Sequence, residues 1–292
     1  MTAKAVYSEI KVESALHKLK RKTPYGWDLN IYRGCGHGCR YCYAMYSHDY
    51  IDPARSFHKD IYVKTNIVDQ LEKELKSESW KREVINIGGV TDSYQPAEKQ
   101  FRLMPRILKL LIKYKTPAII STKSDLVIRD YELIDELSNI TYINIAATIT
   151  TVDDAVRGKI EPESVSAAQR FHVLKEFRKT NASIGLHLMP IIPFITDSED
   201  NFERMFAMAS ECGVHYVLPG VLYMRGKTRQ HFLDFIQNEF PQIFSEFKIL
   251  YKTGGANREY KNELYQMVNP LRTKYNLSGG YMKVMREKMH RN

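Results

Sequence analysis

The chain is poor in cysteine and tryptophan and has no long hydrophobic run. Its 292 residues include 4 cysteines and 2 tryptophans, too few for the disulfide framework of a small secreted protein. The most apolar stretch, residues 107–120, is shorter than a membrane span and is interrupted by lysines. Residues 1–9 lack the apolar core of a signal peptide. We therefore expect a cytoplasmic protein that does not enter the membrane and whose thiols stay reduced.

Two common functional motifs are also missing. The chain contains no phosphate-cradling P-loop and no G-x-S-x-G elbow, which argues against a P-loop nucleotidase and an α/β-hydrolase. It has no internal repeat and no low-complexity tract. Its 43% hydrophobic and 26% charged residues are typical of a globular protein, so we expect one large α/β domain or two small ones.

Three of the four cysteines are concentrated in one short segment, and only Cys212 lies elsewhere. Cys35, Cys39 and Cys42 are separated by three and two residues, so one loop can wrap its thiolates around a single small object. Glycines at positions 34, 36 and 38 remove the Cβ atoms that would hinder so tight a loop. Three thiolates can hold three irons of a four-iron, four-sulfur cluster and leave the fourth iron open for chemistry.

Zinc is the alternative ligand for the same thiols. Cys35, Cys39 and Cys42 could form a Cys3His tetrahedron with either His37 or His48. Structural zinc sites more often use two separated pairs of ligands, which this chain lacks. A disulfide fits less well, because no secretory context is visible.

From residue 29 onward, short β-rich runs alternate with helical patterns. Strands are predicted at Leu29–Arg33, Val84–Gly88, Ala118–Ser121, Tyr142–Thr148, Ser183–Met189 and Val214–Leu218. Helices are predicted at Ile67–Ser77, Ala97–Tyr114, Arg129–Ser138, Ser164–Thr180 and Asn201–Glu211, then at Thr228–Asn238 and Pro241–Tyr251, followed by a tyrosine-rich basic tail. This alternation favours parallel strands with right-handed crossovers, in either an open doubly wound sheet or a partial barrel.

The cysteine spacing, with Tyr41 just before the last cysteine, resembles the signature of the radical S-adenosylmethionine (SAM) enzymes. The resemblance implies a single [4Fe–4S] cluster on Cys35, Cys39 and Cys42, with SAM bound to the open iron. Its reductive cleavage would give a 5′-deoxyadenosyl radical that abstracts hydrogen from a substrate. The implied fold is α/β: a partial (β/α)6 TIM-like barrel at residues 29–220, with an N-terminal extension at 1–28 and a mostly helical C-terminal segment at 221–292.

The resemblance also implies residues that hold SAM, at the ends of the predicted strands. The family's Gly-Gly-Glu motif is matched by Gly88 and Gly89 but not by the next residue, so Thr91 or Asp92 would meet the SAM amino group instead. Lys123 would pair with the methionyl carboxylate as a point charge. The other implied contacts are Thr148 to the ribose hydroxyls and the backbone near Tyr43 to the adenine.

Three segments narrow the resemblance to the branch related to spore photoproduct lyase, often described as DNA repair photolyase-like. They are residues 91–98, residues 122–124 and residues 160–163. That lyase places a hydrogen-donating cysteine after its second strand, whereas residues 88–92 contain none here. The single spare thiol, Cys212, cannot ligate a second cluster, so one cluster is expected.

Positive charge is concentrated at the two ends of the chain. The net charge of +9 divides into +4 for residues 1–33, −2 for residues 34–218 and +7 for residues 219–292. Basic ends would attract a polyanion such as nucleic acid, or they would simply form a solvated surface. A reducing partner resembling flavodoxin or ferredoxin is implied by the family.

Three other side chains have ordinary interpretations. Arg170 is expected at the surface in an ion pair, and Glu161 at the start of a helix, where its charge suits the helix dipole. His187 is expected to face the barrel interior as a hydrogen-bonded core residue.

The sequence therefore predicts a radical SAM enzyme, with lyase-like repair or another radical transformation as its reaction. The alternative is a non-catalytic, zinc-stabilised protein that binds nucleic acid. It explains the cysteines and the charge but leaves the long alternation of strands and helices unexplained.

Overall fold

The structure is a computed structural model that describes residues 5–20 and 25–289. Its larger sheet has seven strands in the order β10-β9-β8-β7-β6-β3-β2, and a smaller sheet has the order β1-β5-β4. The strands are β1 (Val6–Ile10), β2 (Leu16–Lys18), β3 (Trp27–Leu29), β4 (Tyr32–Arg33), β5 (Asp60–Lys64), β6 (Ile85–Ile87), β7 (Ala118–Thr122), β8 (Ile143–Thr148), β9 (Ser183–Ile191) and β10 (Tyr216–Val221).

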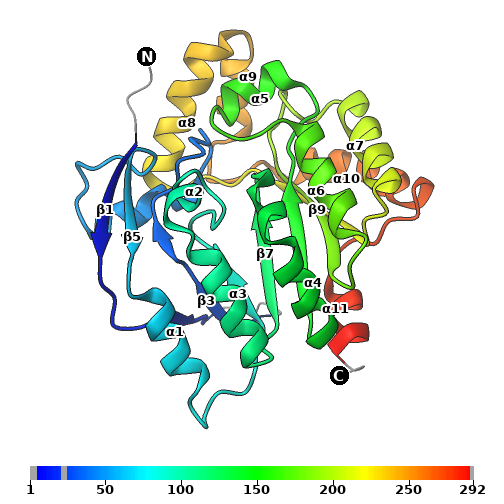
Figure 1. The fold of residues 1–292 in the computed structure, drawn as a ribbon. Coiled ribbons are helices and arrows are strands. Elements are labelled where there is room, and N and C mark those ends of the chain that lie inside the picture. Colours follow the sequence, from blue (N-terminus) through cyan, green and yellow to red (C-terminus); the bar gives the residue numbers. More distant parts are fainter. Residues whose placement is uncertain (1–4, 21–24, 290–292) are drawn as a thin grey trace.

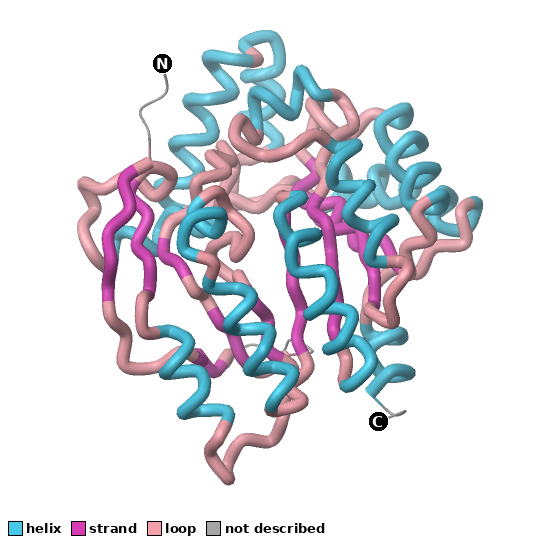
Figure 2. Tube along the Cα trace, in the orientation of Figure 1, coloured by secondary structure: helices cyan, strands magenta, loops and turns pink. Residues whose placement is uncertain are grey.

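Strands β3 and β6–β10 run parallel, and β2 is antiparallel to β3. The helices that connect them are α1 (Ile67–Leu75), α2 (Ala97–Phe101), α3 (Leu103–Lys113), α4 (Tyr131–Ile140), α5 (Asp154–Ile160), α6 (Ala167–Phe177) and α7 (Glu199–Glu211). Figure 1 shows α3, α4 and α6 over the same face of the sheet, and Figure 2 shows these helices in front of the strands. The predicted alternation of strands and helices is therefore confirmed.

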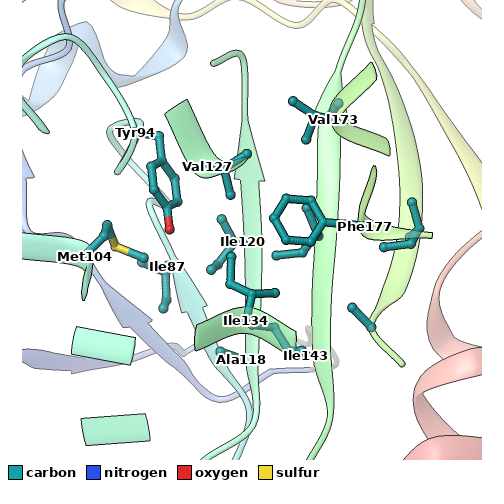
Figure 3. Packing of buried hydrophobic residues seen from close by; sticks show 14 of the residues in the cluster. Ile87, Tyr94, Met104, Ala118, Ile120, Val127, Ile134, Ile143, Val173 and Phe177 are labelled. Carbon is teal, nitrogen blue, oxygen red and sulfur yellow. The ribbon is translucent and has the colours of Figure 1, made fainter. Parts of the chain in front are cut away.

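Apolar side chains fill the layer between the helices and the outer face of the sheet (Figure 3). Ile120 of β7 and Ile143 of β8 lie in the same buried cluster as Ile134 of α4 and Phe177 of α6. Alternate residues of the strands point to the opposite, inner face, where the polar residue Asn144 is fully buried. Parallel strands buried on both faces are expected in this fold class.

The predicted first strand, Leu29–Arg33, is instead two strands in different sheets. Strand β3 ends at Leu29, and β4 begins at Tyr32 and pairs with β5. Asn30 lies at the break, where its main-chain oxygen accepts a hydrogen bond from Lys64 Nζ at 2.6 Å. Its side-chain oxygen accepts one from the Val90 amide at 2.9 Å. These bonds turn the chain out of the larger sheet.

The predicted helix Ala97–Tyr114 is also divided, at Arg102, whose φ is +47°. The carboxylate of buried Glu98 accepts hydrogen bonds from the amides of Leu103 and Met104, each at 3.0 Å. It thereby caps the start of α3 and stabilises the break.

Beyond β10 the chain is helical. The elements are α8 (Gly226–Glu239), a 3-10 turn at Pro241–Ile243, α9 (Phe244–Leu250), α10 (Arg258–Lys274) and α11 (Met282–Met289). The predicted helices at residues 228–238 and 241–251 are close to α8 and α9, and the predicted tail contains two helices more. None of the helices in the described residues combines the length and apolarity needed to cross a membrane.

Candidate metal and cofactor site

The cysteine loop follows β4 and leads into the 3-10 helix η1 (Tyr43–Tyr50). Cys35 and Cys39 are buried, and Cys42 is half-buried. The loop requires glycine at Gly34, where φ is +87° and a Cβ would lie 2.9 Å from the Phe57 carbonyl oxygen. The three thiols are therefore presented by a tightly turned segment within the protein.

Two neighbouring segments hold this loop in place. Thr91 Oγ1 donates a hydrogen bond to the Gly34 carbonyl at 2.6 Å. Gln95 Nε2 donates to the same carbonyl at 3.0 Å, and Gln95 Oε1 accepts the Gly36 amide at 2.9 Å. From the other side, the Arg40 amide donates to the Ile160 carbonyl at 2.9 Å. The turn after β6 and the end of α5 thus fix the position of the cysteine loop.

Burial controls the protonation of the thiols. It raises the pKa of Cys39 to about 12, while the positive charge of Lys123 opposes the shift. Burial also raises the pKa of Cys42, against backbone hydrogen bonds from Ala44 and Met45. Thiolates in such surroundings form when a metal replaces the proton, so loading the site releases protons.

The geometry argues against a single zinc ion held by these cysteines and a histidine. Among residues 5–20 and 25–289, no group of three or more His, Cys, Asp or Glu side chains is close enough to hold one metal ion. His37 Nε2 lies 3.0 Å from Asp92 Oδ2, and its Nδ1 lies 3.4 Å from the Glu163 carbonyl. His48 Nε2 lies 2.8 Å from the Asp60 carbonyl. The two histidines of the zinc alternative are thus engaged elsewhere, whereas three thiols on one loop, two buried and one half-buried, suit an iron–sulfur cluster.

Asp92 connects the cysteine loop to β7. Besides His37, its carboxylate accepts hydrogen bonds from Thr122 Oγ1 at 2.9 Å, the Lys123 amide at 2.9 Å and the Tyr94 amide at 2.8 Å. Burial alone would raise the pKa of Asp92, but His37 and these donors outweigh it and lower the pKa to about 2. Asp92 is therefore a charged anchor for the turns after β6 and β7.

Lys123 lies beside the thiols. Its Nζ is 5.8 Å from the centre of the Tyr41 ring. Burial would lower the pKa of Lys123, but electrostatic interactions with Cys39 and Glu161 raise it. The ammonium group is thus held in its charged form next to the cysteine loop, as an anionic ligand would require.

A buried ion pair between Glu161 and Arg170 contacts the cysteine loop. The sequence analysis did not predict this pair. Arg170, expected at the surface, is 1% exposed, and its Nη2 lies 2.6 Å from Oε2 of the fully buried Glu161. Glu161 also accepts a hydrogen bond from the hydroxyl of Tyr41, inside the cysteine loop. It precedes α6 rather than starting it, since Ser166 caps that helix. Burial would raise the pKa of Glu161, but Arg170 and Lys123 lower it to about 2.

The remaining predicted contacts lie in the turn after β6, at the start of η1 and at the end of β8. Gly88 has a φ of +89°, and a Cβ on Gly89 would lie 2.7 Å from the Asp28 carboxylate. The Tyr43 hydroxyl donates to the Gly89 carbonyl, which joins η1 to this turn. Thr148, at the end of β8, is buried, and its carbonyl accepts a hydrogen bond from Arg170 Nη1 at 2.7 Å.

His187 faces the barrel interior as a hydrogen-bonded residue, as predicted. Its Nδ1 lies 3.2 Å from Ser121 Oγ, and its Nε2 lies 3.1 Å from the Tyr216 hydroxyl. Burial, helped by the charge of Lys123, lowers the pKa of His187 to about 4, so the ring is neutral at physiological pH.

One sequence comparison identifies the family, and another finds relatives over most of the chain. A family model of the radical SAM superfamily matches residues 29–206. An uncharacterised protein of Mycobacterium tuberculosis is 31% identical over 280 residues, which are 94% of this chain and 82% of that protein. An uncharacterised protein of Methanocaldococcus jannaschii is 31% identical over 191 residues, which are 62% of this chain and 70% of that protein.

Solved structures share the fold. Spore photoproduct lyase complexed with dinucleoside spore photoproduct matches with a TM-score of 0.67 and 13% identity, over 92% of this chain and 79% of that chain. Streptococcus suis SuiB bound to precursor peptide SuiA matches with a TM-score of 0.54 and 13% identity, over 86% of this chain and 47% of that chain. The predicted partial (β/α)6 barrel is thereby confirmed.

Proposed function

Because the chain belongs to the radical SAM superfamily, we propose that it is an enzyme whose cluster ligands are Cys35, Cys39 and Cys42. Its cofactors are those of the superfamily, a [4Fe–4S] cluster and SAM. When bound, they supply a 5′-deoxyadenosyl radical able to remove a hydrogen atom from a substrate. The observation that carries the proposal is the presence of three thiols, two buried and one half-buried, on one fixed loop beside a charged lysine.

The protein's own part in this chemistry is to bind and orient. Lys123 holds a positive charge where the carboxylate of SAM would pair with it. Thr91 and Asp92 are the proposed acceptors for its amino group, and both already fix the turn around them. The other proposed contacts are Gly88 and Gly89 through close backbone approach, Thr148 to the ribose and the backbone near Tyr43 to the adenine.

The C-terminal segment covers the cysteine loop. Cys39 and Tyr41 share a buried apolar cluster with Phe232 and Ile236 of α8 and Phe247 of α9. Figure 1 shows α8 and α9 together above one end of the sheet. We propose three parts for the chain, an extension at 1–28, a catalytic barrel at 29–220 and this cover at 221–292. Excluding water and oxygen would be the task of the cover.

The proposed substrate is nucleic acid, with the reaction either a lyase-like repair or another radical transformation. The basic ends support this, and spore photoproduct lyase bound to a dinucleoside lesion shares the fold. The proposed reductant is a flavodoxin- or ferredoxin-like protein, and the proposed compartment is the cytoplasm.

The direct test is cleavage of SAM by the anaerobically purified protein in the presence of a reductant. We expect wild-type protein to release 5′-deoxyadenosine and C39A to release none, because C39A lacks one of the thiolates that hold the cluster. C212A is the matched control, since Cys212 lies at the end of α7 and bonds the Phe171 carbonyl. Undiminished cleavage by C39A would refute the ligand assignment. Deuterium transfer from labelled candidate substrates into 5′-deoxyadenosine then identifies the substrate.

A further inference from the structure

Two adjoining hollows lie between β2, β5 and η1, beside the turn at Gly89. The inner hollow has a volume of about 200 Å³, and Arg33, Lys64 and His17 contribute to its wall. The outer hollow has a volume of about 420 Å³, with Lys18 and Lys20 in its wall. The inner volume is several times the roughly 30 Å³ share of a water molecule, so a phosphate group fits.

The inner hollow contains buried positive charge without a compensating carboxylate. Lys64 is 6% exposed, and the only hydrogen bond of its ammonium group within the described residues is to the Asn30 carbonyl, at 2.6 Å. Arg33 is half-buried and forms no ion pair in the described part of the chain. Burial and the charge of Arg33 lower the pKa of Lys64 to about 8. Buried cations of this kind gain stability when an anion pairs with them.

Glu74 and Asp28, the carboxylates near the two hollows, form hydrogen bonds with other groups. Glu74 accepts hydrogen bonds from the amides of Ala15 and Leu16, at 3.0 and 2.8 Å. Asp28, in the wall of the outer hollow, accepts one from Asn86 Nδ2 at 2.9 Å. The wall of the outer hollow therefore carries two lysines against one carboxylate.

Exposed aromatic rings border the same hollows. Tyr43, Tyr46 and Tyr50 of η1 are 59%, 47% and 78% exposed. A spacing of three residues places Tyr43 and Tyr46 on one face of this 3-10 helix, and the rings of Tyr46 and Tyr50 are 6.2 Å apart. Tyr46 contributes to both hollows. Aromatic rings beside a basic groove are the combination that binds single-stranded nucleic acids, through base stacking and phosphate contacts.

We propose that Arg33 and Lys64 form a subsite for a backbone phosphate of single-stranded nucleic acid, with bases stacked on Tyr46 and Tyr50. The subsite is linked to the reaction centre, because Asn30 bonds both Lys64 and the amide of Val90, next to Gly89. It would fix a strand at a set distance from the SAM site. The inference rests on the proposed function only for the reaction that the bound strand would undergo.

The test measures binding of a fluorescein-labelled oligothymidylate of about eight nucleotides to the full-length protein by anisotropy. We expect R33Q to weaken binding about tenfold, because a charge-assisted hydrogen bond to phosphate is lost. The slope of log K against log salt should become shallower by about 0.7. R106Q removes the same charge from an exposed position of α3 and should leave both quantities unchanged.

Three further variants separate the contribution of charge from that of base stacking. K64M keeps the length of the buried side chain and should weaken binding in the same direction as R33Q. Y46L should weaken binding several-fold without changing the salt slope, whereas Y46F should not weaken it. Equal binding by folded R33Q and R106Q would overturn the proposal.

Inorganic phosphate distinguishes a simple anion site from a strand site. If phosphate binds through Arg33 but R33Q leaves oligonucleotide affinity unchanged, the strand proposal is wrong. The experiments also distinguish failure of the strand subsite from failure of the proposed radical SAM chemistry. Wild-type protein that cleaves SAM but binds no oligonucleotide refutes only this inference, whereas protein that binds the oligonucleotide without holding iron refutes only the proposed chemistry.

Discussion

At the residue scale, single atoms decide how the barrel interior packs. A Cβ on Gly185 of β9 would lie 2.0 Å from Cζ of the Tyr216 ring, so only glycine fits there. The Tyr216 hydroxyl in turn bonds His187 and Asn144. Gly158 of α5 is the opposite case, because nothing lies within 4 Å of a Cβ added to it.

We predict that G185A lowers the free energy of unfolding by about 3 kcal/mol, because the added methyl group displaces a buried ring. G158A should raise it by about 0.5–1 kcal/mol, since alanine favours a helix interior. Urea unfolding followed by circular dichroism measures both. A G185A protein as stable as the wild type would show that Tyr216 does not occupy this position.

At the element scale, buried polar and charged side chains hold neighbouring segments together. Sequence patterns do not reveal which of these side chains will meet. Periodicity predicted most of the strands and helices, and spacing predicted the cysteine loop, because both signals are local. The break at Asn30 was not predictable, since it depends on bonds to Lys64 and Val90, far along the chain. The prediction that Arg170 lies at the surface was wrong for a similar reason. Only the folded chain brings Glu161 into contact with both Arg170 and Tyr41 of the cysteine loop.

The Glu161–Arg170 pair should make the free energy of unfolding decrease at acid pH. The pKa of Glu161 is about 2 in the folded protein against an ordinary value of 4.5 for a solvated glutamate, so its folded value is depressed. The stabilisation is therefore complete above about pH 4.5 and is lost as the pH falls towards 2, amounting to on the order of 3 kcal/mol.

Acid titration of the unfolding free energy tests this dependence. E161Q should be less stable than wild type at pH 7, because Arg170 keeps a buried unpaired charge, and its stability should fall less steeply below pH 4.5. E176Q is the control, since Glu176 pairs with Lys179 at the surface and should have little effect. Parallel curves for E161Q and wild type would contradict the assignment.

At the scale of the whole molecule, the C-terminal helices pack onto the radical SAM domain. Helices α8 and α9 cover the cysteine loop, with Thr228 Oγ1 of α8 donating to the Cys42 carbonyl at 3.2 Å. At the C-terminal end, Met285 of α11 packs with Val84, Ile119 and Tyr142. The sequence pattern predicted α8 and α9 but not α11, and it did not predict where any of these helices pack.

The most direct test of the account is the content of iron and acid-labile sulfide in anaerobically purified protein. The account predicts about four of each per chain for wild type and for C212A, and a marked loss for C39A. One zinc per chain without iron, or a C39A protein that retains the full cluster, would contradict it.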